Sequence, residues 1–160
     1  MTAAETIARP HFGQFSIERA YNHTPERIYH AFEDKAAHYR WFISGEGWEI
    51  GDYTHDFSIG GHEHSTFRPE GHPGWFGNDT WYVELVKGRR IVSVYTMSAE
   101  GKAFSHSLAT IELAPDGKGG CRLTYTEQGA YAGGPQDIVN RKTGCEELFG
   151  KLGVELDTHA

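Results

Sequence analysis

The chain has 160 residues, a length typical of one domain that buries about two-thirds of its unfolded surface. Apolar residues make up 38% and aromatic residues 13%, which excludes a disordered composition. The net charge of −7 argues against nucleic acid and anionic membrane surfaces as partners. No segment approaches the about 20 apolar residues of a membrane span.

The N-terminal segment, residues 1–12, is predicted to be flexible, and a single domain is expected over residues 13–158. The segment lacks the apolar region of a secretory signal, so we expect a cytoplasmic protein. The first strand is predicted over residues 14–21, where Phe15 and Ile17 alternate with polar residues.

Two short helices are predicted after this strand. Thr24 supplies a capping hydroxyl before a proline, which predicts a helix to about residue 33. Asp34 can cap a second helix, which is expected to end at Trp41 and Phe42.

Six further strands and a long helix complete the predicted order. Residues 52–59 and 62–68 flank Gly60 and Gly61, which predicts a two-residue turn with Ile59 opposite His62. Four more strands are expected over residues 80–87, 90–97, 103–114 and 121–129, and a helix of about 20 residues from Pro135. The predicted fold class is therefore α+β: a curved antiparallel sheet of about seven strands around a long C-terminal helix.

These segments resemble the START-like helix-grip superfamily (SRPBCC, polyketide cyclase/dehydrase-like), and in particular its branch of homologues of the activator of the heat-shock-protein ATPase. The resemblance rests on residues 17–42, on the Asp-x-x-x-Gly-Gly segment 56–61, on residues 84–92, on the strands at 107–113 and 122–131, and on the closing helix. It covers nearly the whole chain. It implies the helix-grip fold with a ligand cavity, without implying a particular reaction.

Small inward-facing residues suggest where that cavity would lie. If Ile111 faces the helix, strand alternation turns Ser107 and Ala109 the same way, and Glu127 faces inward if Tyr125 does. The helix presents Gly144 and Cys145 opposite them, and the resembling branch often has Trp at the position of Cys145. Either a ligand or a large aromatic side chain then fills the space.

The orientation of Glu63 stays open at the level of sequence, with a slight preference for the interior. Two carboxylates, Glu63 and Glu127, in one apolar cavity would raise at least one pKa and create a general acid, with Tyr95 as a further candidate catalytic group. The alternative is a surface Glu63 bridged to Arg68 or Arg122. The residues expected to line the ligand site are Trp41, Phe42, Glu63, Trp75, Tyr95, Met97, Ser107, Ala109, Tyr125, Glu127, Gly144, Cys145 and Leu148.

The sequence carries no recognisable metal or cofactor motif. His62 and His64 lie on one strand face, with His55, His72 and His106 as further candidate neighbours, but this spacing is not diagnostic and we expect no native metal site. No nucleotide-binding motif is present, and we expect no cofactor. Cys121 and Cys145 are expected to be free thiols.

The leading functional hypothesis is a binding protein for a small hydrophobic or aromatic, lipid- or polyketide-like molecule. The alternative is a cyclase, dehydratase or hydrolase that uses the two carboxylates, and a third class is a chaperone-associated interaction module. A monomer and a homodimer are both open.

Overall fold

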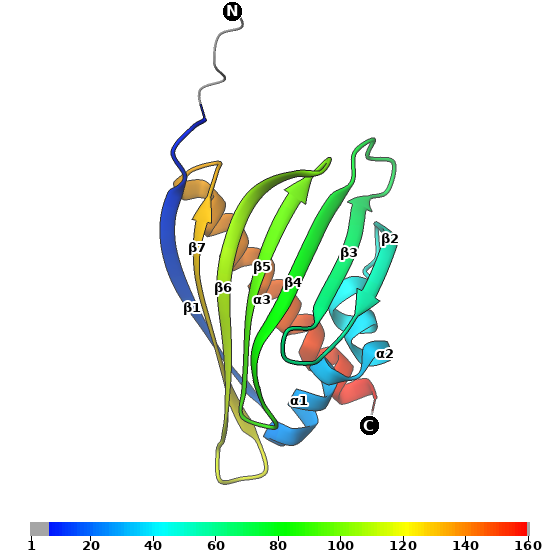
Figure 1. Cartoon of the computed structure of the whole chain (residues 1–160). Coiled ribbons are helices and arrows are strands. Elements are labelled where there is room, and N and C mark those ends of the chain that lie inside the picture. The colour runs from blue at the N-terminus through cyan, green and yellow to red at the C-terminus, as the bar shows by residue number, and fades with distance from the viewer. Residues whose placement is uncertain (1–6, 160) are drawn as a thin grey trace, which may run out of the picture.

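The computed structural model describes residues 7–159, and the first part of the N-terminal segment predicted to be flexible, residues 1–6, lies outside them. Figure 1 shows a curved sheet with one long helix across its inner face and shorter helices beside its lower end. The seven strands, all antiparallel to their neighbours, follow the order β1-β7-β6-β5-β4-β3-β2. The predicted α+β helix-grip fold is confirmed.

The chain begins with β1 (His11–Tyr21), which pairs along its whole length with β7 (Cys121–Tyr131). The first helix, α1 (Pro25–Glu33), is capped as predicted, because the Thr24 hydroxyl accepts a hydrogen bond from the Arg27 N–H at 3.2 Å. The carboxylate of Asp34 caps α2 (Lys35–His38) by accepting from the Ala37 N–H at 2.9 Å. A π-helical turn, η1 (Tyr39–Ile43), continues α2 and turns Trp41 into the core.

The meander comprises β2 (Trp48–His55), β3 (His62–Pro69), β4 (Phe76–Val86), β5 (Arg90–Ala99) and β6 (Lys102–Pro115). The two-residue turn predicted at Gly60 and Gly61 is wrong. The connection spans residues 56–61, and His55 rather than Ile59 is the last residue of β2, opposite Glu63. Gly60, with φ of +81°, closes a turn inside this longer loop and donates its N–H to the Tyr82 carbonyl, which ties the loop to β4.

The long helix, α3 (Pro135–Thr158), closes the fold over the inner face of the sheet (Figure 1). Phe149, Leu152 and Leu156 are buried on it and pack with Ile17 of β1 and Leu123 of β7 in the core. The helix packs mainly against β1, η1 and α1, and less extensively against β7. The strands β4 and β5 lie farther along the sheet from β1 and β7, and several of their inward-facing residues are only half-buried.

Cys121 and Cys145 are both free and buried, as expected. No helix among residues 7–159 is long and apolar enough to cross a membrane.

Candidate functional site

Two groups of buried polar side chains lie on the inner face of the sheet, where an apolar core would be expected. The Glu127 cluster consists of Glu127, Arg141, Tyr95, Tyr125, Tyr131, Ser105 and Ser107. The Glu63 cluster consists of Glu63, His38, His55 and Tyr82. Buried polar groups require partners, so each cluster defines a place where the fold has been built around specific polar chemistry.

The carboxylate of Glu127 is completely buried and accepts hydrogen bonds from three tyrosines. Its Oε1 accepts from the Tyr95 hydroxyl and, at 2.6 Å, from the Tyr125 hydroxyl. Its Oε2 accepts from the Tyr131 hydroxyl at 2.6 Å and from the Ser107 hydroxyl at 2.9 Å. Strand alternation explains the convergence, because these residues all face inward from β5, β6 and β7.

Arg141 of α3 supplies the positive charge of this cluster. Its Nη1 lies 3.2 Å from Glu127 Oε2 and 2.8 Å from the Tyr95 hydroxyl, and its Nη2 donates to Ser105 Oγ at 2.6 Å. Arg141 was not among the residues expected to line the site, yet its guanidinium balances the charge of Glu127. The signal was present: Arg141 precedes the buried Cys145 by four residues, on the same face of the helix.

The hydroxyl groups of the cluster remain protonated. Burial raises the pKa of Tyr95 and of Tyr125 well above the usual 10, and the negative charge of Glu127 raises both further. Burial also raises the pKa of the Cys145 thiol, to about 12. Each hydroxyl around Glu127 already donates its one proton to this carboxylate, so the cluster offers a ligand fixed hydroxyl lone pairs and balanced charge, which suits the recognition of an uncharged polar group better than proton abstraction.

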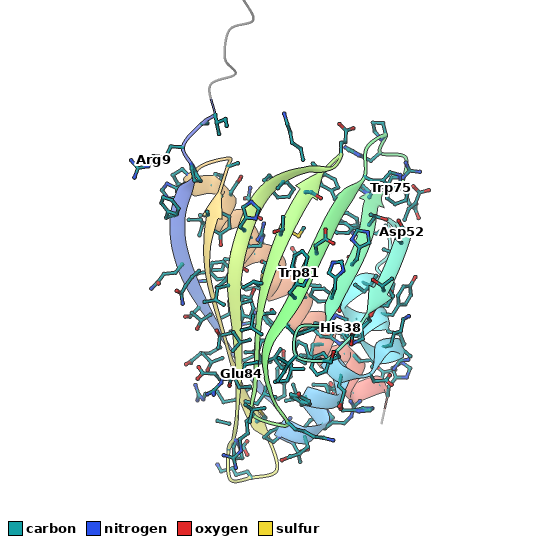
Figure 2. The ribbon with its side chains drawn as sticks, in the orientation of Figure 1. Arg9, His38, Asp52, Trp75, Trp81 and Glu84 are labelled. Atoms are coloured by element: carbon teal, nitrogen blue, oxygen red, sulfur yellow. The ribbon has the colours of Figure 1, made fainter. Side chains whose placement is uncertain are left out.

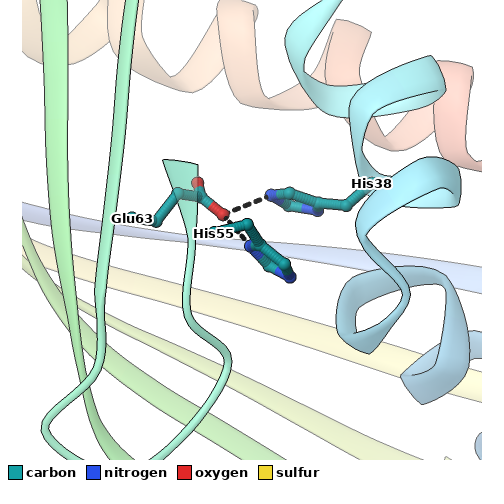
Figure 3. Close-up of side chains that lie close together, drawn as sticks. All are labelled: His38, His55 and Glu63. Carbon is teal, nitrogen blue, oxygen red and sulfur yellow. Dashed lines mark hydrogen bonds and ion pairs between the residues drawn. The ribbon is translucent and has the colours of Figure 1, made fainter. Parts of the chain in front are cut away.

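The Glu63 cluster joins four elements of the chain, α2, β2, β3 and β4, and Figure 3 shows its members from the first three. Glu63 Oε1 lies 2.9 Å from His38 Nε2 and 2.6 Å from His55 Nδ1, and it accepts a hydrogen bond from the Tyr82 hydroxyl at 3.1 Å. The side chains of His38, His55 and Glu63 are 4%, 2% and 4% exposed. Burial alone would raise the pKa of Glu63, but the imidazoles of His38 and then His55 hold it low, at about 2.

The length of the loop 56–61 decides the orientation that the sequence left open. Because β2 ends at His55, opposite Glu63, both side chains face the interior together. His62 and His64 face outward, and each contacts Asp79 Oδ1 at 2.8 Å. The alternative of a surface Glu63 bridged to Arg68 or Arg122 is wrong. His62 and His64 lie side by side on one strand face as predicted, whereas His55 lies on the inner face beside Glu63.

The structure does not bring Glu63 and Glu127 together. They lie on β3 and β7, four strand spacings apart, which corresponds to about 19 Å along the sheet. The hydrogen-bond and ion-pair partners of the two carboxylates have no residue in common. A single reaction centre that uses both carboxylates therefore has no geometric support.

The other residues expected to line a ligand site occupy different environments. Trp41 is 2% exposed, and its indole N–H donates to the Ala31 carbonyl at 2.9 Å, whereas Phe42 stacks on His38. Trp75 is 36% exposed beyond the end of β3, under the guanidinium of Arg68 (Figure 2). Ala109 and Cys145 are buried, and Met97, Gly144 and Leu148 are half-buried.

Open space is found on both sides of the sheet. A Cβ added at Gly144, on the flank of α3, would meet no atom within 4 Å other than its own stretch of helix. On the outer face, Trp81, Val94 and Leu108 are exposed on three adjacent strands beside an open hollow of about 390 Å³. Figure 2 shows Trp81 on this face.

Comparisons with known proteins agree with this architecture. The sequence model of a family described as "Activator of Hsp90 ATPase homolog 1-like protein" matches residues 22–157. The crystal structure of the protein Mll3558 from Rhizobium loti is 37% identical, with a TM-score of 0.84 over 92% of this chain and 99% of that one. A protein from Rhizobium leguminosarum is 26% identical, with a TM-score of 0.85 over 92% of this chain and 96% of its own.

More distant structures share the fold alone. CalU16 from Micromonospora echinospora is 19% identical, with a TM-score of 0.63 over 92% of this chain and 78% of its own. No curated protein matches the chain.

Proposed function

This chain belongs to the family of activator of Hsp90 ATPase homolog 1-like proteins, and within that fold we propose that it binds a small hydrophobic or aromatic molecule between the sheet and α3. The observation that carries the proposal is the half-covered inner face of β4 and β5, opposite the flank of the helix at Gly144. Small pockets with a few fixed polar groups in apolar surroundings are the usual form of ligand sites.

The residues on this face have the composition that such a ligand requires. Tyr95 and Met97 of β5 are half-buried and face inward, and Leu148 of α3 is half-buried as well. Ser107 and Ala109 provide small side chains beside them. The free space at Gly144 supports a ligand position against this flank of the helix.

The Glu127 cluster would form the polar end of the site. Its charges are balanced between Glu127 and Arg141, and its tyrosines retain their protons. An uncharged hydroxyl, phenol or carbonyl group is therefore a better match than a carboxylate or an amine, because it can exchange hydrogen bonds without adding a buried charge. The proposed ligand is mostly apolar, with one such polar group.

A cyclase, dehydratase or hydrolase is less well supported. That alternative relied on Glu63 and Glu127 acting on one substrate, and paired carboxylates act together only within about 10 Å. Glu63 and Glu127 lie four strands apart and belong to clusters with no residue in common, which does not favour such an arrangement.

Ligand-dependent thermal stabilisation tests the proposal. We expect at least one compound from a panel of flavonoids, fatty acids and sterols to raise the melting temperature, because a ligand that binds only the folded state stabilises it. Gly144→Leu should remove this effect by filling the free space. Gly150→Leu, a similar change at an exposed position of the same helix, should retain it.

Two outcomes would contradict this assignment of the site. One is the absence of any shift for the wild-type protein up to the solubility limit of every compound. The other is an equal loss of stabilisation in both glycine variants, which would point away from the flank at Gly144.

A further inference from the structure

The Glu63 cluster brings three side chains of the kinds that bind transition metals to one buried point. One ligand atom from each of His38, His55 and Glu63 lies within 4.8 Å of the other two. Figure 3 shows one nitrogen of each imidazole directed at the same carboxylate oxygen of Glu63. In a tetrahedral site, metal–ligand bonds of about 2.0–2.2 Å place neighbouring donor atoms about 3.3–3.6 Å apart, so the observed 2.9 and 2.6 Å would lengthen by about 0.4–1.0 Å when an ion enters.

The hydrogen bond on the far side of His55 fixes which of its nitrogens is free. His55 Nε2 lies 3.3 Å from the backbone carbonyl oxygen of Glu33, which can only accept, so Nε2 carries the proton. In a neutral imidazole, Nδ1 then presents a lone pair to Glu63 Oε1, which is itself an acceptor. Two acceptors at 2.6 Å require a proton or a metal ion between them. A backbone carbonyl behind the second ring nitrogen is also the usual arrangement around a metal-bound histidine.

His38 provides the second, independent indication. Although Nε2 is 2.9 Å from Glu63 Oε1, neither ring nitrogen has a hydrogen-bond partner within residues 7–159, and the side chain is 4% exposed. Buried polar groups without partners are rare in native proteins and call for an explanation such as a bound ion. The unpartnered nitrogen that faces Glu63 therefore points to a missing ligand.

A proton alone accounts for this arrangement poorly. One shared proton can satisfy only one of the two nitrogen–oxygen pairs. Two protons would place imidazolium ions on His38 and His55, whose rings are stacked with centroids 5.0 Å apart, in surroundings that include Phe42 and Phe57. Like charges at this distance in a poorly hydrated site repel strongly. One divalent ion satisfies both nitrogens and the carboxylate at once.

We propose that His38, His55 and Glu63 bind one divalent transition-metal ion of the zinc class, with Tyr82 as a positioning residue that holds the carboxylate. Two imidazoles and one carboxylate form a donor set that suits Zn²⁺ and its neighbours in the first transition row, and not Ca²⁺ or Mg²⁺. Three protein donors leave a fourth position for water or another small ligand. The proposal does not depend on ligand binding near Gly144.

The second histidine cluster of the chain must be removed before metal binding is measured. His62, His64 and Asp79 also gather three potential donors, but on the outer face, where the two histidine side chains are 43% and 32% exposed. The double variant His62→Asn/His64→Asn is therefore the reference protein. It should fold normally, because it changes only surface side chains.

Calorimetric titration of the metal-free reference protein with Zn²⁺ should show one ion bound per chain, and Co²⁺ should give the visible absorption of a four-coordinate site. Loss of a residue outside the ligand shell weakens metal binding by about 10- to 100-fold. Glu63→Gln, introduced into the reference protein, changes a ligand itself and should weaken Zn²⁺ binding by more than this. Tyr82→Phe should fall within that smaller range. The proposal is overturned if the reference protein binds no metal or if Glu63→Gln leaves the affinity unchanged.

Nitrogen-15 NMR of the histidine rings locates the ion without altering the buried residues. Zn²⁺ should shift His38 Nε2 and His55 Nδ1 to metal-bound values while His55 Nε2 keeps its proton. Shifts confined to other histidines would disprove the site even if Glu63→Gln failed to fold.

Discussion

Arg141 is the residue on which the electrostatic balance of the inner face depends. Its guanidinium is the cationic partner of Glu127, a carboxylate that is 0% exposed. Removing one member of a buried ion pair leaves the other charge without compensation, which costs about 3–5 kcal/mol. Four hydroxyl donors would remain around Glu127, so we expect Arg141→Met to lower the free energy of unfolding by a value near the lower end of that range.

The double variant Arg141→Met/Glu127→Gln separates this charge effect from lost packing. Neutralising Glu127 in the Arg141→Met background should recover part of the lost stability, whereas Glu127→Gln alone should destabilise. Urea denaturation of all four proteins measures the coupling. Purely additive effects would show that the two charges do not interact.

Single residues also show where the sequence was informative. The inward orientation of Ser107, Ala109 and Glu127 followed from alternation alone, because the period of a strand fixes its faces once one residue is placed. Glu63 could not be placed with the same certainty, because its face depends on the length of a loop. His38 was missed because its partner His55 is 17 positions away, and proximity across helices and strands leaves no local pattern.

Within the helices and turns, substitution by alanine should have opposite effects on stability at Gly150 and at Gly101. Gly150 lies exposed within α3, with nothing within 4 Å of an added Cβ, so Gly150→Ala should stabilise the protein by about 0.5–1 kcal/mol. Gly101 lies in the turn between β5 and β6 with φ of +77°, where Gly101→Ala should destabilise by about 1 kcal/mol. Thermal unfolding of both variants measures the difference. Changes of the same sign would contradict these backbone assignments.

Elements with strong local signals were predicted well. The caps at Thr24 and Asp34 fixed the starts of α1 and α2, and Pro135 marked the start of α3. The connection between β2 and β3 was predicted wrongly because Gly60 serves a turn within a longer loop, which is held by its hydrogen bond to β4. That tertiary contact has no counterpart in the local sequence.

The whole molecule should lose stability in alkaline solution. In the folded protein the pKa of Cys145 is about 12, and those of Tyr95 and Tyr125 lie well above 10, because burial disfavours their charged forms. In the unfolded chain these groups ionise near their ordinary values of about 8.5 and 10. Above these values the unfolded state loses protons that the folded state retains, so the free energy of unfolding falls as the pH rises.

Denaturant titrations between pH 7 and pH 11 measure this dependence. The decline should begin near pH 9 and steepen near pH 10. Cys145→Ala should remove part of the early decline, and the rest comes from Cys121, whose thiol pKa is also raised by burial. A free energy of unfolding that is constant up to pH 11 would mean that these groups are not protected from ionisation in the way that their burial implies.

The strand order has a consequence for the synthesis of the protein. Within the described residues, β1 pairs only with β7, and Tyr21 lies opposite Cys121 while His11 lies opposite Tyr131. On the ribosome, β1 of the nascent chain therefore cannot pair with β7 until more than a hundred further residues have emerged, and both of its backbone edges stay exposed until then. Exposed strand edges are the usual starting points of aggregation, and pairing between distant segments slows folding. Because β1 remains unpaired until β7 has been synthesised, it is the segment that a cellular chaperone would need to protect during synthesis.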